Sequence, residues 1–489
     1  MRYFPTLALL LLLGAAPALS PEPSVPSIER SACAVPVAKN ERIDCYMLTV
    51  PEDRSARNQK TIRFPVVLFH SRSITPKSDP VIFTEGGPGN STIRDVRSGR
   101  ATASLDDRDF IVFEQRGSTY AKPPLACPEM NAIDNRYSDE NLTFAQAVRL
   151  QVKAALVCRK RLTRAGIDVR AYNTAAIADD VADLASALHL QNINLIGLSY
   201  STALFMEVVR RHPGLVRSLV LDSVMPIDSR YDEVANANAL RSLHQVFDSC
   251  AVDPVCSRTY PGLETAFEAL VIGLNAKPLH VRLKSTEGHL VPYTVNGRNL
   301  VEGIYGVALQ DADAIRGVPH AIWQAHRGDF HEVLAYVQSN MGGPDYSYGA
   351  RLSVLCHDFV AFESADRIMA QATLSPELGG MNAANLSTPV CNAWKSGRAN
   401  PSQFTPVRSD VPVLVFAGAF DPNTPPQWGQ QVRRTLPNSY FIEFPAAVHD
   451  AGLDSRCGLS LAATFFDNPT MPPYLPCLAR LRPPAFRLQ

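Results

Sequence analysis

A serine lies at the point where an apolar strand gives way to a helix, a position that can expose a nucleophile. The run 193–204 reads INLIGLSYSTAL, and Ser199 directly follows its apolar part. Gly197 and Ser201, two residues before and two after Ser199, are small, because larger side chains there would strike the strand or the helix. A hydroxyl held in such a turn can attack a carbonyl carbon. The usual pattern is Gly-x-Ser-x-Gly, so a plain helix N-cap at Ser199 is the alternative interpretation.

A serine hydroxyl is a poor nucleophile unless a base removes its proton and an acid orients that base. Asp421 follows the apolar run 413–416, and His449 follows the run 440–444. Both residues thus lie just past the carboxyl end of a predicted strand, where α/β sheets place ligands. Taken singly, Asp421 could cap an Asp-Pro turn and His449 could be a surface histidine. Their order after Ser199 on successive strands predicts the catalytic triad Ser199, Asp421 and His449.

A glycine-rich loop after another apolar run is a candidate for an oxyanion hole. The run 81–84 leads into the sequence EGGPGN at 85–90. An oxyanion hole needs backbone N–H groups that no side chain obstructs. We therefore predict the N–H groups of Gly87 and Tyr200 as its two donors. A plain turn that ends the strand is the alternative.

Short apolar runs recur along the chain, and several are continuous rather than alternating. They cover residues 64–69, 81–84, 110–113, 193–196, 219–221, 413–416 and 440–444. Continuous runs are typical of strands buried on both faces of a parallel sheet. Helical patterns lie between them, at 177–188 and from 203 to 209. This alternation predicts an α/β fold and, with the turn at Ser199, an α/β-hydrolase fold, in which helices flank a mostly parallel sheet.

The alternation of strands and helices stops near Pro226 and resumes near Val411. Helical patterns fill the interval, at residues 240–247, 263–274, 299–309, 314–326 and 330–337. We interpret residues 226–400 as an inserted, mainly helical lid. Residues 21–225 and 401–489 are then the N-terminal and C-terminal parts of the hydrolase core.

The first 20 residues have the pattern of a secretory signal peptide. Arg2 gives a positive start, residues 7–13 are apolar, and an Ala-x-Ala site follows at 16–18. The apolar run is too short for a membrane span, which takes about 20 residues. We therefore expect a mature protein, without a membrane segment, that is secreted or periplasmic.

The ten cysteines fit an oxidising compartment, because their number is even and they fall in neighbouring pairs. Zinc binding is the alternative, but no Cys-x-x-Cys pair occurs. Local pairing closes the shortest loops. It predicts five disulfides, namely Cys33–Cys45, Cys127–Cys158, Cys250–Cys256, Cys356–Cys391 and Cys457–Cys477.

The charge balance argues against partners that are recognised by a strong electrostatic field. Lys and Arg together number 47, as do Asp and Glu. Such a neutral chain has no overall field for nucleic acid or an anionic membrane. We expect no cofactor and no metal, a small peptide, ester or amide as substrate, and an oligomeric state that the sequence leaves open.

Beyond these patterns, the chain resembles the secreted tripeptidyl aminopeptidase-like branch of the proline iminopeptidase (S33) group of α/β hydrolases. The matching motifs span most of the chain after the signal peptide. They are Gly86–Gly89, Glu114–Ser118 with Leu125–Cys127, Gly197–Thr202, Leu221–Val224, Asp421–Pro425, and His449 with Ser455–Cys457 and Cys477. Residues 401–489 correspond to the carboxyl-terminal, TAP-like part of that group.

Several residues depart from the family pattern, although the triad is complete. Glu85 stands where related peptidases often have His or Asn, and Glu114 replaces Asp. Ser118, Ser201 and Asp450 occupy positions where glycine is more usual. These departures bear on the substrate and on the shapes of the loops.

The resemblance implies an exopeptidase that releases short units from peptide N-termini. It also implies an acidic lid residue that pairs with the free α-amino group, for which Glu302, Asp311 and Asp313 are candidates. An esterase or amidase with the same triad is the alternative, and a binding protein on an inactive hydrolase scaffold is a third possibility. A glycan on the sequon at 90–92 would crowd the site, so we expect a bacterial protein in which that sequon is unused.

Overall fold

The computed structural model describes residues 25–37, 41–56, 60–95, 106–136, 142–285, 288–341, 346–384 and 386–488. The predicted signal peptide, residues 1–20, lies outside the described residues. None of the helices in these ranges combines the length and hydrophobicity that a bilayer span requires.

A nine-stranded sheet forms the core, in the order β1-β2-β3-β5-β4-β6-β7-β10-β11. The strands from β5 to β11 in this order are parallel, whereas β1, β2 and β3 add antiparallel neighbours at one edge. The bounds are β1 (Ser27–Arg30), β2 (Ile43–Pro51), β3 (Thr61–Phe69), β4 (Lys77–Thr84), β5 (Arg108–Phe113), β6 (Ile193–Leu198), β7 (Val216–Asp222), β10 (Val413–Gly418) and β11 (Ser439–Phe444). All seven predicted runs fall inside observed strands, so the mostly parallel α/β prediction is confirmed.

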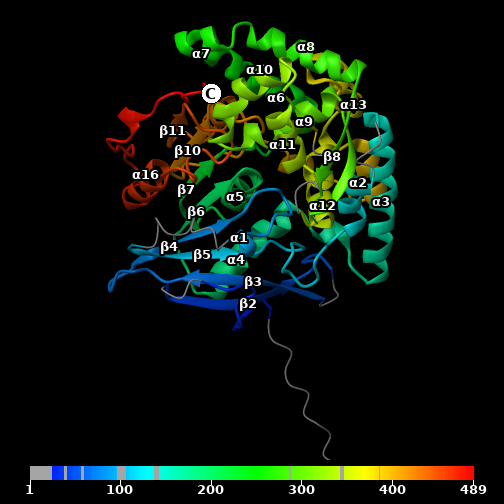
Figure 1. Ribbon diagram of the computed structural model, residues 1–489. Coiled ribbons are helices and arrows are strands. Elements are labelled where there is room, and N and C mark those ends of the chain that lie inside the picture. Colours follow the sequence, from blue (N-terminus) through cyan, green and yellow to red (C-terminus); the bar gives the residue numbers. More distant parts are fainter. Residues whose placement is uncertain are drawn as a thin grey trace, which may run out of the picture.

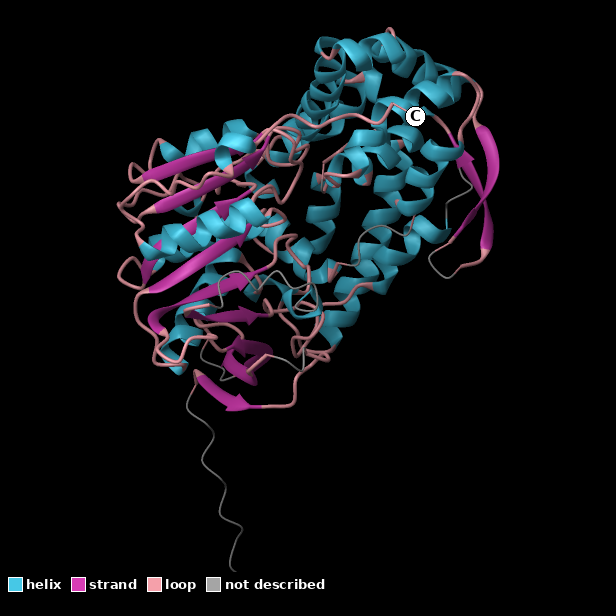
Figure 2. Ribbon diagram, turned by 60° about the vertical axis from the view of Figure 1, so that its left-hand side comes forward, coloured by secondary structure: helices cyan, strands magenta, loops and turns pink. Residues whose placement is uncertain are grey.

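The apolar runs are continuous because both faces of the sheet are buried. In β10, Val413 and Val415 belong to one hydrophobic cluster and Leu414 and Phe416 to the cluster on the opposite face. Helices α4 (Thr174–Ala187) and α5 (Tyr200–Arg211) contribute buried residues to the first cluster. Helices α1 (Thr92–Asp95) and α16 (Arg456–Asp467) do so on the second. Figures 1 and 2 show this layered arrangement.

The segment between β7 and β10 forms a mainly helical cap at one end of the sheet (Figure 1). Its α-helices are α6 (Tyr231–Val252), α7 (Pro254–Thr259), α8 (Leu263–Ala276), α9 (Gly297–Gly306), α10 (Val318–His326), α11 (His331–Ser339), α12 (Tyr348–Asp358), α13 (Ala365–Leu374) and α14 (Thr388–Trp394). Helices α6 to α11 bury a hydrophobic cluster that Phe420 and Val448 of the core join, whereas the buried residues of α12 to α14 belong to a cluster that covers the sheet. The limits 226 and 400 of the lid remain a prediction.

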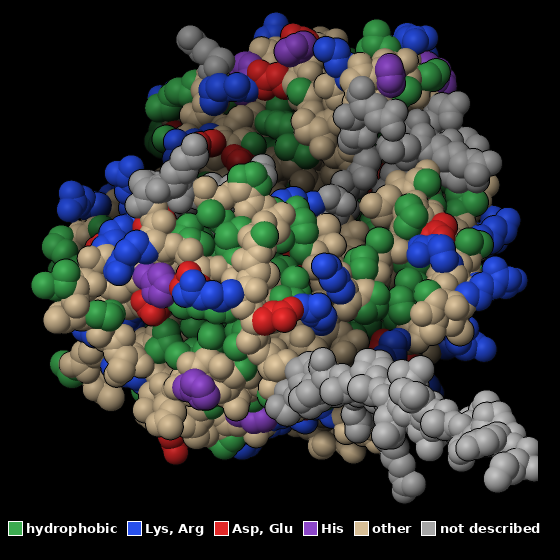
Figure 3. Space-filling model, turned by 90° about the horizontal axis from the view of Figure 1, so that it is seen from below, with side chains coloured by type: hydrophobic (Ala, Val, Ile, Leu, Met, Phe, Trp, Pro, Cys, Tyr) green, Lys and Arg blue, Asp and Glu red, His purple; other side chains and the backbone are tan. Residues whose placement is uncertain are grey.

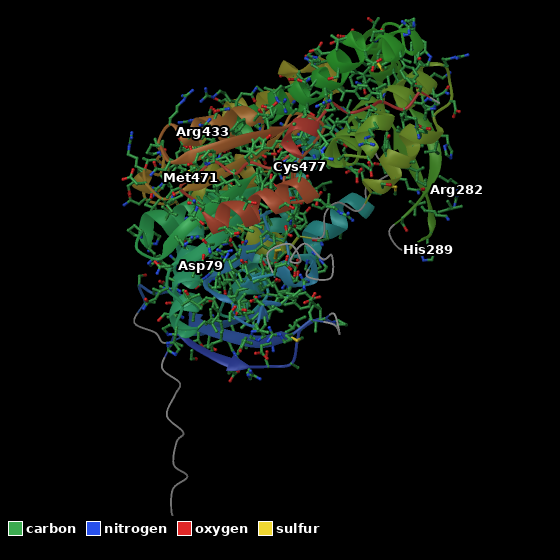
Figure 4. The ribbon with its side chains drawn as sticks, turned by 90° about the vertical axis from the view of Figure 1, so that its left-hand side faces the viewer. Asp79, Arg282, His289, Arg433, Met471 and Cys477 are labelled. Carbon is green, nitrogen blue, oxygen red and sulfur yellow. A yellow bond between two sulfur atoms is a disulfide. The ribbon has the colours of Figure 1, made fainter. Side chains whose placement is uncertain are left out.

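Two further features of the cap were not predicted. The hairpin β8 (Leu279–Lys284) and β9 (Leu290–Val295) projects from it, and Figure 4 shows Arg282 and His289 there, well away from the main sheet. Helices α2 (Pro128–Arg136) and α3 (Phe144–Arg164) precede β6 in the chain, yet α3 packs against α14 of the cap. Residues from the N-terminal part of the chain thus extend the cap.

All five predicted disulfides are present in the structure. Three of these disulfides link one helix to another. Cys127–Cys158 ties the start of α2 to α3, Cys250–Cys256 ties α6 to α7, and Cys356–Cys391 ties α12 to α14. Cys457–Cys477 anchors the C-terminal tail to α16.

Candidate functional site

Ser199 occupies a tight turn between β6 and α5. Its backbone has φ 57° and ψ −124°, an unfavourable conformation for a residue with a side chain. Its N–H donates to Asp222 O at 3.0 Å, which ties the turn to the end of β7. A Cβ on Gly197 would lie 2.9 Å from Ser201 O and from Thr202 Cα, so only glycine fits there. The turn therefore has the strand–serine–helix geometry that the sequence predicted.

Ser201 is fully buried and bonds within the same turn. Its hydroxyl donates to Leu198 O at 2.9 Å and accepts from Leu198 N at 2.8 Å. A serine is therefore tolerated where glycine is usual, because both hydrogen-bonding capacities of its hydroxyl are used.

Asp421 and His449 meet across the loops that follow β10 and β11. Asp421 Oδ2 lies 2.9 Å from His449 Nδ1. Three further donors reach this buried carboxylate, namely Asn423 N at 2.8 Å, Thr424 N at 2.9 Å and Thr424 Oγ1 at 2.7 Å. A proton on Nδ1 satisfies the carboxylate and leaves Nε2 as the basic nitrogen of the ring.

The electrostatics of this pair favour its charged forms. Burial by itself would lower the pKa of His449, but the charge and hydrogen bond of Asp421 outweigh it and raise the pKa above 6.5. Burial likewise acts to raise the pKa of Asp421, yet His449 and the donors from Thr424 bring it below 3.8. Asp421 is thus a carboxylate at neutral pH and stabilises an imidazolium on His449.

Ser199 and His449 line one cavity of about 630 Å³ between the sheet and the cap. The core contributes the glycine loop after β4, and the cap contributes residues of α9, α11 and α12. Met130 of α2 and Gln151 of α3 also line the cavity, so the unpredicted helix pair forms part of its wall.

The outer surface of the molecule has mixed charge. Figure 3 shows a face on which charged side chains of both signs lie among hydrophobic ones.

The glycine loop lies directly against the serine turn. A Cβ on Gly86 would lie 2.9 Å from Ser199 Cβ and 3.3 Å from Tyr200 N, so any side chain there would intrude at the site. Gly87 has φ 105°, which also favours glycine. Tyr200 N is at the first position of α5, where the helix dipole favours a negative charge. The arrangement suits Gly87 and Tyr200 for the predicted oxyanion hole.

Residues 114–118 make hydrogen bonds that hold the glycine loop in place, and they do not line the cavity. Buried Glu114 accepts hydrogen bonds from Ser91 Oγ at 3.0 Å, Ile93 N at 3.1 Å and Tyr120 N at 3.1 Å, and burial raises its pKa to about 7. Gln115 Nε2 donates to the backbone oxygen of Glu85 at 2.7 Å. These contacts fix both ends of the segment that carries Gly86 and Gly87.

Comparison with known proteins finds two family models that match parts of the chain. The family model described as "TAP-like protein" matches residues 376–476, and the one described as "alpha/beta hydrolase fold" matches residues 79–247.

The chain has an α/β-hydrolase fold with a TAP-like carboxyl-terminal segment.

Its curated relatives are distant. The tripeptidyl aminopeptidases of Streptomyces coelicolor and Streptomyces lividans are each 26% identical over 206 residues, which cover 40% of this chain and 38% of theirs. The putative hydrolase YuaR of Escherichia coli is 24% identical over 226 residues, 44% of this chain and 42% of that protein. The match thus spans well under half the length of each relative.

Among solved structures, the proline iminopeptidase of Mycobacterium smegmatis is 15% identical, with a TM-score of 0.39, and the match covers 84% of this chain and 96% of that one. An α/β hydrolase fold protein from Chitinophaga pinensis is 13% identical, with a TM-score of 0.36, and covers 83% and 94% respectively.

Among the described residues, six that are not glycine have a positive φ, and two of them, Ser223 with φ 54° and Asp450 with φ 66°, lie next to the catalytic loops. Their side chains and backbones hold the loop of His449. Ser223 Oγ accepts from Asp450 N at 2.9 Å and donates to Asp222 Oδ1 at 3.1 Å. Asp222 Oδ2 in turn accepts from Gly452 N and Leu453 N, each at 2.8 Å.

Of the three acidic residues considered for an amino-group site, Glu302 alone lines the cavity. Its carboxylate lies 3.7 Å from Arg298 Nε on the same helix. Asp311 instead accepts from Ala314 N at 2.7 Å, and the side chain of Asp313 is 91% exposed. Glu85 is a second cavity carboxylate, which the sequence marked only as a departure from the family pattern.

Cap residues that contact the catalytic loops were missed. Tyr305 OH donates to Asn423 Oδ1 at 2.7 Å, and Asn423 Nδ2 donates to Gln310 Oε1 at 2.7 Å. No motif marks such residues, because they are brought to the site by packing of the cap.

As for metal binding, Cys127, Glu129 and Cys158 are the one set of close ligand atoms among the described residues, and a disulfide uses both thiols.

Proposed function

We propose that this protein is an exported serine exopeptidase that releases short units from the amino ends of peptides. Ser199 Oγ attacks the scissile carbonyl carbon while His449 takes its proton, and Asp421 stabilises the resulting imidazolium. The N–H groups of Gly87 and Tyr200 bind the oxygen as its negative charge develops. These roles rest on the hydrogen bond between Asp421 and His449 and on the turn conformation of Ser199.

The reaction then proceeds through an acyl-enzyme. His449 gives its proton to the leaving amine, which departs with the rest of the peptide as the C–N bond breaks. Water enters, His449 removes a proton from it, and the hydroxide attacks the ester carbon of the acyl-enzyme. The proton returns to Ser199 and the short N-terminal unit leaves as a free acid.

The observation that carries the exopeptidase assignment is the joint lining of one cavity by Ser199, His449 and the cap residue Glu302. Its volume of about 630 Å³ suits a small ligand, since such sites span roughly 300–1,000 Å³. A carboxylate in this cavity can pair with the ammonium group of a peptide that enters by its end. The printed name of the Streptomyces relatives, tripeptidyl aminopeptidase, agrees with this assignment.

Export is supported by the five disulfides, because such bonds persist in oxidising compartments. The signal-peptide pattern of residues 1–20 points the same way.

The deciding experiment is a substrate panel. It contains short peptide amides with a free amino terminus, the same peptides N-acetylated, and short-chain esters, each assayed with wild type and with Ser199→Ala. We expect Ser199-dependent cleavage of the free peptides and little of the acetylated ones, because a blocked amine leaves the cavity carboxylate unpaired. Equal cleavage of both peptide sets contradicts an aminopeptidase. Activity confined to esters makes the protein an esterase, and no turnover of any substrate makes it an inactive scaffold.

A further inference from the structure

The start of cap helix α12 is fastened to the glycine loop that carries the proposed oxyanion donor. Arg351 Nη1 donates to Gly87 O at 2.6 Å, and it lies 3.4 Å from Pro88 O. Ser347 N, just before α12, donates to Gly89 O at 2.9 Å. Two successive parts of the cap thus bind two backbone oxygens of the loop.

Close packing accompanies these hydrogen bonds. A Cβ on Gly89 would lie 2.9 Å from Ser347 O and 3.3 Å from Arg351 Cβ. Ser347 Oγ also donates to Gly117 O at 2.6 Å, and Gly349 N donates to Leu125 O at 2.8 Å. Because backbone meets backbone here, α12 cannot slide along the core without breaking the contact.

Arg351 is itself held in place. It is 6% exposed, and its guanidinium carbon lies 4.3 Å from the centre of the Tyr346 ring. A planar guanidinium stacked on an aromatic ring has few alternative orientations. Its hydrogen bond to Gly87 O is therefore directional as well as short.

The orientation of Gly87 matters because glycine is otherwise free to rotate. At φ 105° it occupies a region that glycine enters easily and leaves easily. Its N–H is the predicted oxyanion donor, and its carbonyl belongs to the next peptide group. A hydrogen bond to that carbonyl limits rotation about the N–Cα and Cα–C bonds of Gly87. It therefore also restricts the direction in which the N–H of Gly87 points.

We propose that Arg351 is a positioning residue that holds the oxyanion loop from the cap, so that the hole is complete only when α12 is docked. This inference rests on the proposed function of Ser199. It assigns the cap a part in catalysis besides restricting access to the cavity.

The test compares Arg351→Met, Arg351→Lys, Ser199→Ala and Arg282→Met with wild type. Arg282 lies on the exposed hairpin β8–β9, so its variant controls for loss of a cap arginine. The readouts are kcat and KM for p-nitrophenyl acetate and the rate of labelling by a fluorophosphonate, with unfolding midpoints measured in parallel. The small acetate ester makes few contacts with the cap, so its KM reports little on peptide binding.

For Arg351→Met we expect kcat to fall about 10- to 100-fold, with KM within about twofold of the wild-type value. One oxyanion donor raises kcat by a factor of about 10²–10³, and a misdirected donor loses part of that factor. The rate of fluorophosphonate labelling should fall by the same factor as kcat. In Arg351→Lys, which keeps one charged donor, kcat should fall less than in Arg351→Met. The kcat of Arg282→Met should equal that of wild type. If Arg351→Met does not fold, a fall in kcat of about threefold or more in Arg351→Lys still supports the proposal.

Unchanged kcat in Arg351→Lys and Arg351→Met, or a loss confined to KM or to the unfolding midpoint, overturns the positioning role. Wild-type turnover in Ser199→Ala instead overturns the proposed function itself, so the two failures are distinguishable.

Discussion

At the scale of single residues, two serines near the site make hydrogen bonds that glycine could not make. Ser201 bonds to the backbone of its own turn, and Ser223 bonds to Asp450 N. A left-handed non-glycine residue is destabilising by on the order of 1 kcal/mol or more. At Ser223 the hydroxyl offsets part of that strain while fixing the loop of His449.

Asp421→Asn should reduce kcat/KM about 10⁴-fold, because the amide favours the wrong tautomer of His449. The acid limb of the residual activity should also move to lower pH. Catalysis needs a neutral imidazole, and in wild type Asp421 raises the pKa of His449 above 6.5, so activity falls as pH drops through that raised value. Without the carboxylate the imidazolium loses its stabilisation and forms only at lower pH. The measurement is the pH profile of kcat/KM for both proteins.

Asp450→Asn serves as the comparison, since Asp450 adjoins His449 but is not its hydrogen-bond partner at Nδ1. A benign Asp421→Asn together with a severe Asp450→Asn would show that the catalytic acid is Asp450.

At the scale of elements, prediction from sequence succeeded where burial on both faces leaves a strong pattern. Each strand of the parallel part of the sheet has a mainly apolar run, interrupted by Asn194 in β6 and by Glu443 in β11, and each of these runs was predicted. β8 reads LHVRLK and lies half in solvent, so it has only a short alternating pattern. Sequence order does not reveal that α3, which precedes β6 in the chain, packs on α14 of the cap.

The same limit applies to the site. Ser199, Asp421 and His449 follow strand ends and could be predicted together, as could Gly87 and Tyr200. Arg351 and Tyr305 reach the catalytic loops through long-range packing of cap helices, which no local motif records.

Glu302 tests the role of helix α9 in binding. Glu302→Gln should raise KM for free-amino-terminus peptides by about tenfold or more, because a charged hydrogen bond contributes about 1.5–3 kcal/mol. Hydrolysis of p-nitrophenyl acetate should not change, since that ester has no ammonium group. Glu264→Gln, at an exposed position of α8, is the matched control. An unaltered peptide KM in Glu302→Gln would move the amino-group site elsewhere, with Glu85 the next candidate.

At the scale of the whole molecule, the C-terminal tail joins the core to the cap. The disulfide Cys457–Cys477 fixes the start of this tail to α16. From there the tail runs to the cap, as the position of the C-terminus in Figure 2 shows. Phe486 is buried in the hydrophobic cluster of the cap, and Tyr260 OH donates to Arg487 O at 2.8 Å. The tail thus supplements α12 in holding the cap over the sheet.

Phe486→Ala should therefore lower the free energy of unfolding by about 3 kcal/mol, the usual loss for a buried phenylalanine. Thermal unfolding followed by circular dichroism measures this change. Leu488→Ala, two residues further along and 39% exposed, should stay close to wild type. An unfolding free energy that Phe486→Ala leaves unchanged would mean that the tail does not stabilise the cap.

The most direct measurement of the central claim is covalent labelling of the intact protein with a fluorophosphonate, followed by peptide mapping. We predict a single labelled residue, Ser199, and no labelling of Ser199→Ala, whose turnover should fall by about 10⁴-fold or more while its fold is retained. Label on another serine, or wild-type turnover by Ser199→Ala, would contradict the assignment of Ser199 as the nucleophile.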